Sequence, residues 1–486
     1  RNLSITDEHM IHELYDITKG NIGLISNIRE YIDLASLTGT ESLHKQLFQI
    51  LDRRMASSVK ITEETLHTLQ TATVIGKEFN LLYLHRLLEQ SMETLDSYME
   101  IGCEEKLVTK EEGENTFFFS ADTIYNFFVS KLNVRSKEYH YRFAKILEKI
   151  SPYQFYQRYF HMNMSGNTSE AIPLLTVHCI RQCVDGFNPD DKLLETLQLH
   201  DNYWNVYQNI SYTMKNYRRG TEYKKYYDLI ESSDVYVNPM VTVERDYVLC
   251  FLKYRTGNVD DYHDIEPILA EYFNEDIDFS QHIRIGILLF LLYCNRLGDY
   301  KKAKQTEKKI TRQIQKALEN KADVEKELRI MERLSPALYA NEVAYVKTKR
   351  SLNYFEYKRM NYGKEYIMSL TNFLGVAIYV VGTTADSNLS WESLYLKACE
   401  GIEFLDNTFN MNIYGIPKLI NNYILVGIFS GNLSLQDGVT LYDSLLSEPG
   451  HLPSKPLLEC NRMMLLFFSE SGSDVLEPMR ILFQNN

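Results

Sequence analysis

The residues with the most evident chemical potential are a histidine and two cysteines on one predicted helix. His178, Cys179 and Cys183 bring an imidazole and two thiols together. Cys179 and Cys183, four residues apart, share a helix face, but His178 points elsewhere and no second ligand pair lies nearby. Buried small residues are therefore a better interpretation than a metal site, and we predict no metal centre.

Patterns for covalent or phosphate chemistry are missing from the chain. It contains no Gly-x-Ser-x-Gly and no His-Glu-x-x-His sequence. Gly76-Lys77 and Gly363-Lys364 both lack the upstream glycine of a phosphate-binding loop. We predict no catalytic residue and no bound cofactor in these 486 residues.

Two concentrations of basic residues stand out in a chain whose formal net charge is −13. A solvated helix face is the simpler interpretation of each. The alternative is a groove wall for an acidic protein segment or a nucleic-acid strand. The candidate partner-binding residues are Tyr217, Arg218, Arg219, Lys224 and Lys225 in the first concentration, and Lys301, Lys302, Lys308 and Arg312 in the second.

Composition restricts the classes of function. A net charge of −13 argues against coating nucleic acid or an anionic membrane. No stretch reaches the roughly 18 apolar residues needed to cross a bilayer. Seven cysteines without a Cys-x-x-Cys pair indicate a reducing compartment, and we expect a cytoplasmic protein that binds neither membrane nor nucleic acid.

The elements that would position these residues are almost all helices. Low proline and glycine content and recurrent helical spacing predict a mostly α protein. A glycine followed by Asn or Asp recurs at Gly166, Gly257, Gly298 and Gly431, at intervals of 91, 41 and 133 residues. Those intervals fit two, one and three units of about 41 to 45 residues. In each, we expect a left-handed glycine to end one helix and its neighbour to cap the next. The prediction is a tetratricopeptide-like α-solenoid, a right-handed stack of roughly seven to eight hairpins.

A different pattern precedes these repeats. Three helical segments begin after Thr62, at Leu81 and at Met92, and strand candidates follow at 107–109 and 116–119. Three helices and a hairpin predict a winged helix. The predicted domains are a short N-terminal helical lid (1–57), the winged helix (58–135) and the repeat array (136–486). The third helix is acidic, with Glu93, Asp96 and Glu100, which opposes insertion into a DNA groove.

Three phrases in this order carry a family resemblance. They are LYDITKGNI at 14–22, LQTATVIGKEF at 69–79, and FSADTI at 119–124 followed by YHYRFA at 139–144. The chain resembles the C-terminal half of the signal-transduction ATPases with numerous domains, the STAND class, which includes MalT-like and AfsR-like regulators and bacterial antiviral sensors. The resemblance implies that Gly20, Asn21, Ile22 and Ala121 lie near a nucleotide. Two of these depart from the family pattern: the lid proline is Ile22 and the exit histidine is Ala121.

That resemblance implies a function. The array would bind a trigger, which we expect to be a protein. The winged helix would relay that binding to an ATPase module upstream of Arg1. ATP or ADP and Mg²⁺ would be bound by the full-length protein, and a homo-oligomer would form on activation. Two alternatives stay open: a DNA-binding transcription regulator, and a plain repeat scaffold for protein–protein interaction.

Overall fold

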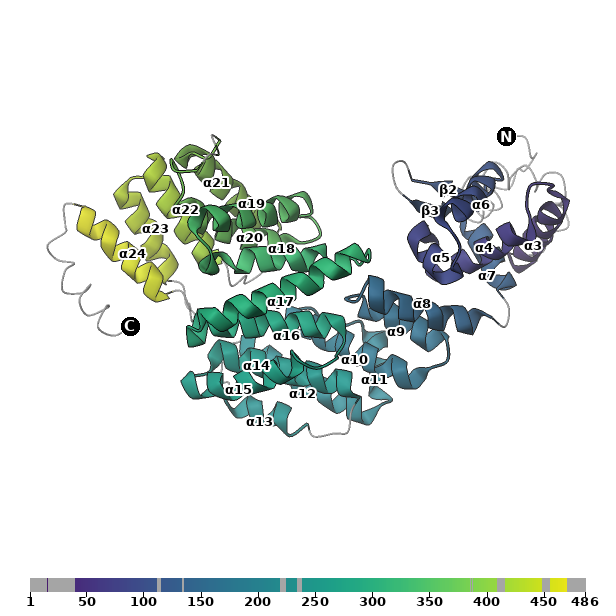
Figure 1. Ribbon diagram of the computed structural model, residues 1–486, viewed down its shortest axis with the longest axis horizontal. Helices are drawn as coiled ribbons and strands as arrows, with labels where there is room; N and C mark the ends of the chain where they lie inside the picture. Colours follow the sequence, from purple (N-terminus) through teal and green to yellow (C-terminus); the bar gives the residue numbers. More distant parts are fainter. Residues whose placement is uncertain are drawn as a thin grey trace. The chain divides into compact units, whose positions relative to one another are not determined.

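The computed structural model describes residue 15 and residues 40–111, 115–132, 135–218, 224–233, 238–384, 386, 388–408, 416–447 and 455–469. Within them the chain is mostly α-helical (Figure 1). It divides into two compact units. Unit 1 comprises residues 1–179 and 191–197, and unit 2 comprises residues 180–190 and 198–486.

The described elements follow one another with short connections. In unit 1 they begin with α3 (Thr40–Ser57), α4 (Glu63–Ile75), β1 (Glu78–Asn80), α5 (Leu81–Leu88), α6 (Met92–Glu104), β2 (Val108–Lys110), β3 (Thr116–Phe119), α7 (Asp122–Lys131), α8 (Ser136–Ile150) and α9 (Phe155–Met164). They continue with α10 (Thr168–Asp185), α11 (Asp191–Gln198), α12 (Asp201–Arg218), α13 (Lys224–Glu231), α14 (Pro239–Thr256), α15 (Val259–Tyr272), α16 (Phe279–Leu292) and α17 (Tyr300–Glu319). The last are α18 (Glu325–Leu334), α19 (Asn341–Tyr357), α20 (Gly363–Ala377), α21 (Trp391–Thr408), α22 (Ile416–Ser430), α23 (Leu435–Ser447) and α24 (Lys455–Phe468). A π-helical turn at Tyr293–Leu297 and a 3₁₀ turn at Pro336–Leu338 complete them.

The first part of unit 1 combines helices with a small sheet. The three helices expected after Thr62 are present as α4, α5 and α6. The Thr62 side chain accepts a hydrogen bond from the Thr65 backbone N–H, which satisfies one of the free donors at the start of α4. Asn80 and Ser91 cap α5 and α6 in the same way.

A three-stranded antiparallel sheet joins these helices in the order β1-β3-β2. Phe117 of β3 lies opposite Phe79 of β1 and Lys110 of β2. Rings from this sheet and from α7 fill the core: Phe79, Phe117, Phe119, Phe127 and Phe128 are all buried. Two of these strands were predicted from the sequence, with β2 shifted by one residue, and β1 was not predicted.

Helix α8 links this module to the helices that follow within unit 1. One side of it packs on α4 and α5, where Phe143 and Leu147 join Val74 and Leu87 in a small core. The Tyr139 hydroxyl lies 2.9 Å from His67 Nε2, and the Tyr83 hydroxyl lies 2.8 Å from Ser151 Oγ. Helix α8 also packs on α9.

Unit 2 repeats a simple arrangement. Helices adjacent in sequence pack as pairs, for example α14 with α15, α16 with α17 and α19 with α20. The even-numbered helices α12 to α22 also contact the next even-numbered helix, which joins the pairs into a continuous layer. Figure 1 shows this succession from α12 to α24, coloured teal to yellow.

Each copy of the recurring glycine phrase lies between two consecutive helices, but the backbone conformation of the glycine differs between copies. Gly166, Gly298 and Gly431 adopt positive φ angles of 87°, 68° and 78°, as expected. Gly257 does not: its φ is −79°, and a Cβ there would lie only 2.4 Å from the Lys253 carbonyl oxygen. Close approach of the backbone, rather than left-handed geometry, therefore requires glycine at 257.

Capping also varies. Asn258 forms a reciprocal capping box with Asp261 at the start of α15, and Asp299 caps α17. At α23 the box is formed instead by Ser434 and Asp437, so Asn432 is not the cap there. Each copy of the phrase therefore lies at a turn, but the residue that caps the following helix differs from copy to copy.

Candidate functional site

The residues expected near a nucleotide are only partly described. Gly20, Asn21 and Ile22 lie outside the described residues. Ala121 precedes α7, is 4% exposed, and accepts hydrogen bonds at its carbonyl from the backbone N–H groups of Ile124 and Tyr125. Its methyl group belongs to the core of the helix–sheet module.

The first basic concentration lies around the end of α12 and the start of α13. The Tyr217 hydroxyl accepts a hydrogen bond from Arg255 Nε at 3.3 Å. Arg218, Lys224 and Lys225 have their backbones in these helices, but their side chains lie outside the described part of the chain, as does the whole of Arg219. The structure therefore places Tyr217 alone among these five side chains.

The second concentration lies on α17, and the structure divides it into two sets. Lys302 is anchored, because its Nζ lies 2.7 Å from Glu266 Oε1. Lys301, Lys308 and Arg312 are exposed and form no hydrogen bond or ion pair within the described residues. Lys316, one turn beyond Arg312, shares that property. These four side chains are named the cationic stripe below.

The histidine and the two cysteines of α10 pack against other side chains. Cys179 is fully buried and Cys183 is 4% exposed. The His178 ring packs against Tyr156, with ring centroids 5.6 Å apart. Among the described residues, no group of three or more His, Cys, Asp or Glu could hold a metal ion. All seven cysteines are free thiols.

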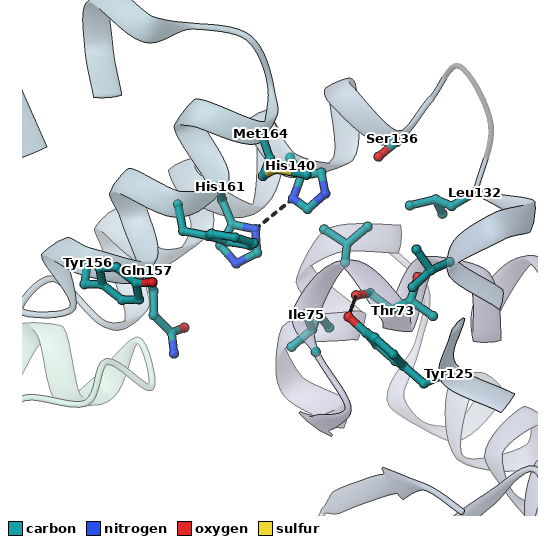
Figure 2. Close-up of a pocket in the computed structure, with 14 residues that line it drawn as sticks. Thr73, Ile75, Tyr125, Leu132, Ser136, His140, Tyr156, Gln157, His161 and Met164 are labelled. Carbon is teal, nitrogen blue, oxygen red and sulfur yellow. Dashed lines mark hydrogen bonds between the residues drawn. The ribbon is translucent and has the colours of Figure 1, made fainter. Parts of the chain in front are cut away.

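A cavity of about 360 Å³ in unit 1 was not anticipated from the sequence. Its walls come from the end of α4, from α7, and from α8 and α9. Figure 2 shows Thr73, Ile75 and Tyr125 on one side and Tyr156 and His161 on the other. Four apolar lining side chains are each more than 40% exposed: Val129, Tyr156, Phe160 and Met164. Among the described residues that line this cavity there is no Lys, Arg, Asp or Glu.

Two buried histidines form part of the cavity wall. His140 Nδ1 of α8 and His161 Nδ1 of α9 lie 2.8 Å apart, so one ring donates a hydrogen bond to the other. Burial lowers the pKa of both, and that of His161 falls to about 3 because the neighbouring His140 adds to the effect. The pair is therefore neutral at pH 7 and holds α8 against α9 without charge.

Unit 2 contains a buried ionic cluster where three helices meet. Glu244 of α14 is 1% exposed and accepts hydrogen bonds from Arg181 of α10 and Arg284 of α16. Gln281 donates a further bond at 3.1 Å. Burial alone would raise the pKa of Glu244, but the two guanidinium groups outweigh it and lower the pKa to about 2.

A second buried carboxyl lies on the next helix of that layer. Glu327 of α18 is 6% exposed and forms no ion pair within the described residues. Burial raises its pKa to about 7. Glu244 and Glu327 thus have opposite shifts because only the first has cations in contact.

The histidine pair and the ionic cluster are only weakly indicated by the sequence. His140 lies inside the YHYRFA phrase, but nothing local pairs it with His161. Arg181, Glu244 and Arg284 are separated by about 40 residues or more, so their meeting depends on the stacking of the helices.

No helix in the described part of the chain is both long and apolar enough to cross a membrane. Comparison with known proteins found no family model, no curated protein and no solved structure that matches this chain.

Proposed function

We propose that this chain is the non-catalytic regulatory and sensor region of a STAND-type ATP-dependent switch. In this proposal α4 to α6 and the sheet form a winged helix, and the later helices form a tetratricopeptide-like array that binds a protein trigger. The winged helix passes that binding to an ATPase module upstream, which would hold ATP or ADP and Mg²⁺. Such a switch would serve antiviral defence or transcription control.

The single observation that carries the proposal is the position of α8. It packs on α4 and α5 and also on α9, and its Phe143 ring contacts both Tyr83 of α5 and His161 of α9. A helix shared in this way moves with both neighbours, because a packed core resists continuous deformation. A trigger that favours one arrangement of the first repeat helices would therefore bias the helix–sheet module as well.

The surface of α6 supports a protein-facing role for this module over DNA binding. Glu93 and Glu100 are exposed on it. The nearby cations Lys60 and Lys110 are engaged in ion pairs with Glu104 and Asp96. A recognition helix in a DNA groove needs cations that are free to reach phosphates.

The test uses the full-length natural protein and nucleotide exchange. Replacing Tyr83 and Tyr139 by Phe removes the two tyrosine hydroxyl contacts between α8 and the helix–sheet module. We expect ADP release to change by threefold or more, while Tyr141→Phe, on the exposed side of α8, leaves it unchanged. A full-length protein without a phosphate-binding loop and without nucleotide binding would refute the proposal.

A further inference from the structure

We infer that the cationic stripe of α17 is the docking surface for an acidic protein segment. Lys301, Lys308, Arg312 and Lys316 define this stripe. The inference rests on the proposed function only in identifying that segment with the trigger. The surface and its charge belong to unit 2 alone.

The stripe follows from the helical period. Positions 301, 308, 312 and 316 recur every seven or four residues, so they lie along one face of α17. The opposite face is packed: Ala303, Ile310 and Ile314 are fully buried. From Lys301 to Lys316 the face is about 22 Å long at the usual rise of an α-helix.

The neighbouring cations of α17 are already occupied. Lys302 pairs with Glu266, and Lys309 donates to the Phe273 carbonyl at 2.8 Å and to Asn274 at 3.1 Å. Lys304 lies over the Tyr339 ring. These residues fix α17 to its neighbours and leave the stripe pointing to solvent.

Elsewhere in unit 2, cations without a partner occur singly along a helix. Lys364 of α20 and Lys418 of α22 are examples among the described residues. Only along α17, in the described part of unit 2, do four such cations share one helix face. Their clustering, rather than their charge alone, distinguishes this surface.

Such a surface is electrostatically unsatisfied. Like charges four residues apart on a helix repel one another, and Arg312 lies between Lys308 and Lys316 at that spacing. Carboxylates from a partner would relieve the repulsion. The Arg312 guanidinium can also bind a carboxylate through two parallel hydrogen bonds.

An acidic protein segment fits better than a nucleic acid. A nucleic-acid strand extends well beyond a 22 Å face and would meet a chain of net charge −13. Strand binding also uses stacking rings beside the cations. Tyr300, 56% exposed at the start of α17, is the one such ring on this helix. A short acidic segment interacts mainly with the positive side chains of the stripe, because salt screens charges more than about 8 Å away at physiological ionic strength.

The test measures binding of a labelled 20-residue acidic helical peptide, with Glu spaced three and four residues apart, to the 486-residue chain. The variant carries Lys301→Gln, Lys308→Gln and Arg312→Gln together. We expect its Kd to rise about tenfold at 50 mM salt, since three exposed ion pairs are lost. Lys316 should be protected from acetylation by the peptide in the parent chain.

A matched control removes the same charge elsewhere, through Lys215→Gln, Lys364→Gln and Lys418→Gln, all exposed and without an ion pair among the described residues. It should leave the Kd within twofold. Equal weakening by the control, absence of peptide binding to the parent chain, or stripe-dependent binding of a 20-nucleotide oligothymidylate tighter than the peptide would each overturn the inference. Because these measurements use no nucleotide, loss of the ATPase proposal would leave their outcome unchanged.

Discussion

The neutral histidine pair between α8 and α9 should make unit 1 sensitive to acid. His161 is 3% exposed, and its Nδ1 lies 2.8 Å from that of His140. Its pKa falls from 6.5 to about 3 in the folded chain. The perturbation is His161→Asn, because the Asn side chain can offer a hydrogen-bonding atom near the Nδ1 position but cannot take up a proton.

The magnitude follows from proton linkage. Between pH 3 and 6.5 the unfolded chain binds a proton at His161 that the folded chain does not, so the free energy of unfolding falls as the pH falls. At pH 5 the unfolded imidazole is almost fully protonated, about 1.5 pH units below its pKa. The loss relative to pH 7 is therefore about 2 kcal/mol. Burial also lowers the pKa of His140, which adds a loss of the same sign.

The assay must report on unit 1. Both tryptophans, Trp204 and Trp391, lie in unit 2, so their fluorescence does not monitor α8 or α9. Hydrogen exchange of peptides from α8 and α9 across a denaturant series gives the local unfolding free energy at pH 7 and pH 5. Exposed His263 supplies the control, His263→Asn.

We expect the parent chain to lose about 2 kcal/mol more between pH 7 and pH 5 than His161→Asn does. The His263→Asn chain should behave like the parent. If His161→Asn shows the same pH dependence as the parent, the imidazole does not titrate with a depressed pKa. The account of a neutral pair would then be wrong.

Four further changes test the packing of unit 2, with tryptophan fluorescence as the readout. Glu244→Gln removes the buried carboxylate that faces the half-buried guanidinium groups of Arg181 and Arg284, and it should cost about 3 kcal/mol at pH 7, more than the loss of any exposed ion pair in unit 2. Glu327→Gln should stabilise the unit by about 3 kcal/mol at pH 8 and have no effect below pH 4.5, because the folded pKa of about 7 makes stability fall as the pH rises above 4.5. Gly286→Ala should cost about 1–3 kcal/mol, since the new Cβ would lie 2.5 Å from a Phe273 ring carbon. Gly375→Ala, whose Cβ would meet its nearest atom at 3.6 Å, should instead be neutral or slightly stabilising.

Several local features of this protein could be predicted from its sequence. The helices beginning at Glu63, Leu81 and Met92 lie where apolar spacing and capping residues indicate. The turns at Gly298 and Gly431 have the left-handed glycine expected from the recurring phrase. These features depend on interactions between residues within one or two helical turns of each other. Their order along the chain is therefore enough to predict them.

The remaining features depend on which distant segments meet. Strand β1 has three residues and only Phe79 is buried, which is too short a pattern to predict a strand, and it pairs with β3 almost 40 residues later. The same holds for His140 with His161 and for Glu244 with its two arginines. Helical periodicity indicates the buried face of each segment, but it does not indicate the partner of that face.

The cationic stripe combines both kinds of information. The sequence by itself placed several cations on the helix that became α17. The tertiary structure decided that Lys302 and Lys309 anchor this helix while Lys301, Lys308, Arg312 and Lys316 face solvent, because the acceptors come from α15 and the residues that follow it. Charge along a chain is a local property, whereas its neutralisation depends on neighbours that only packing brings within reach.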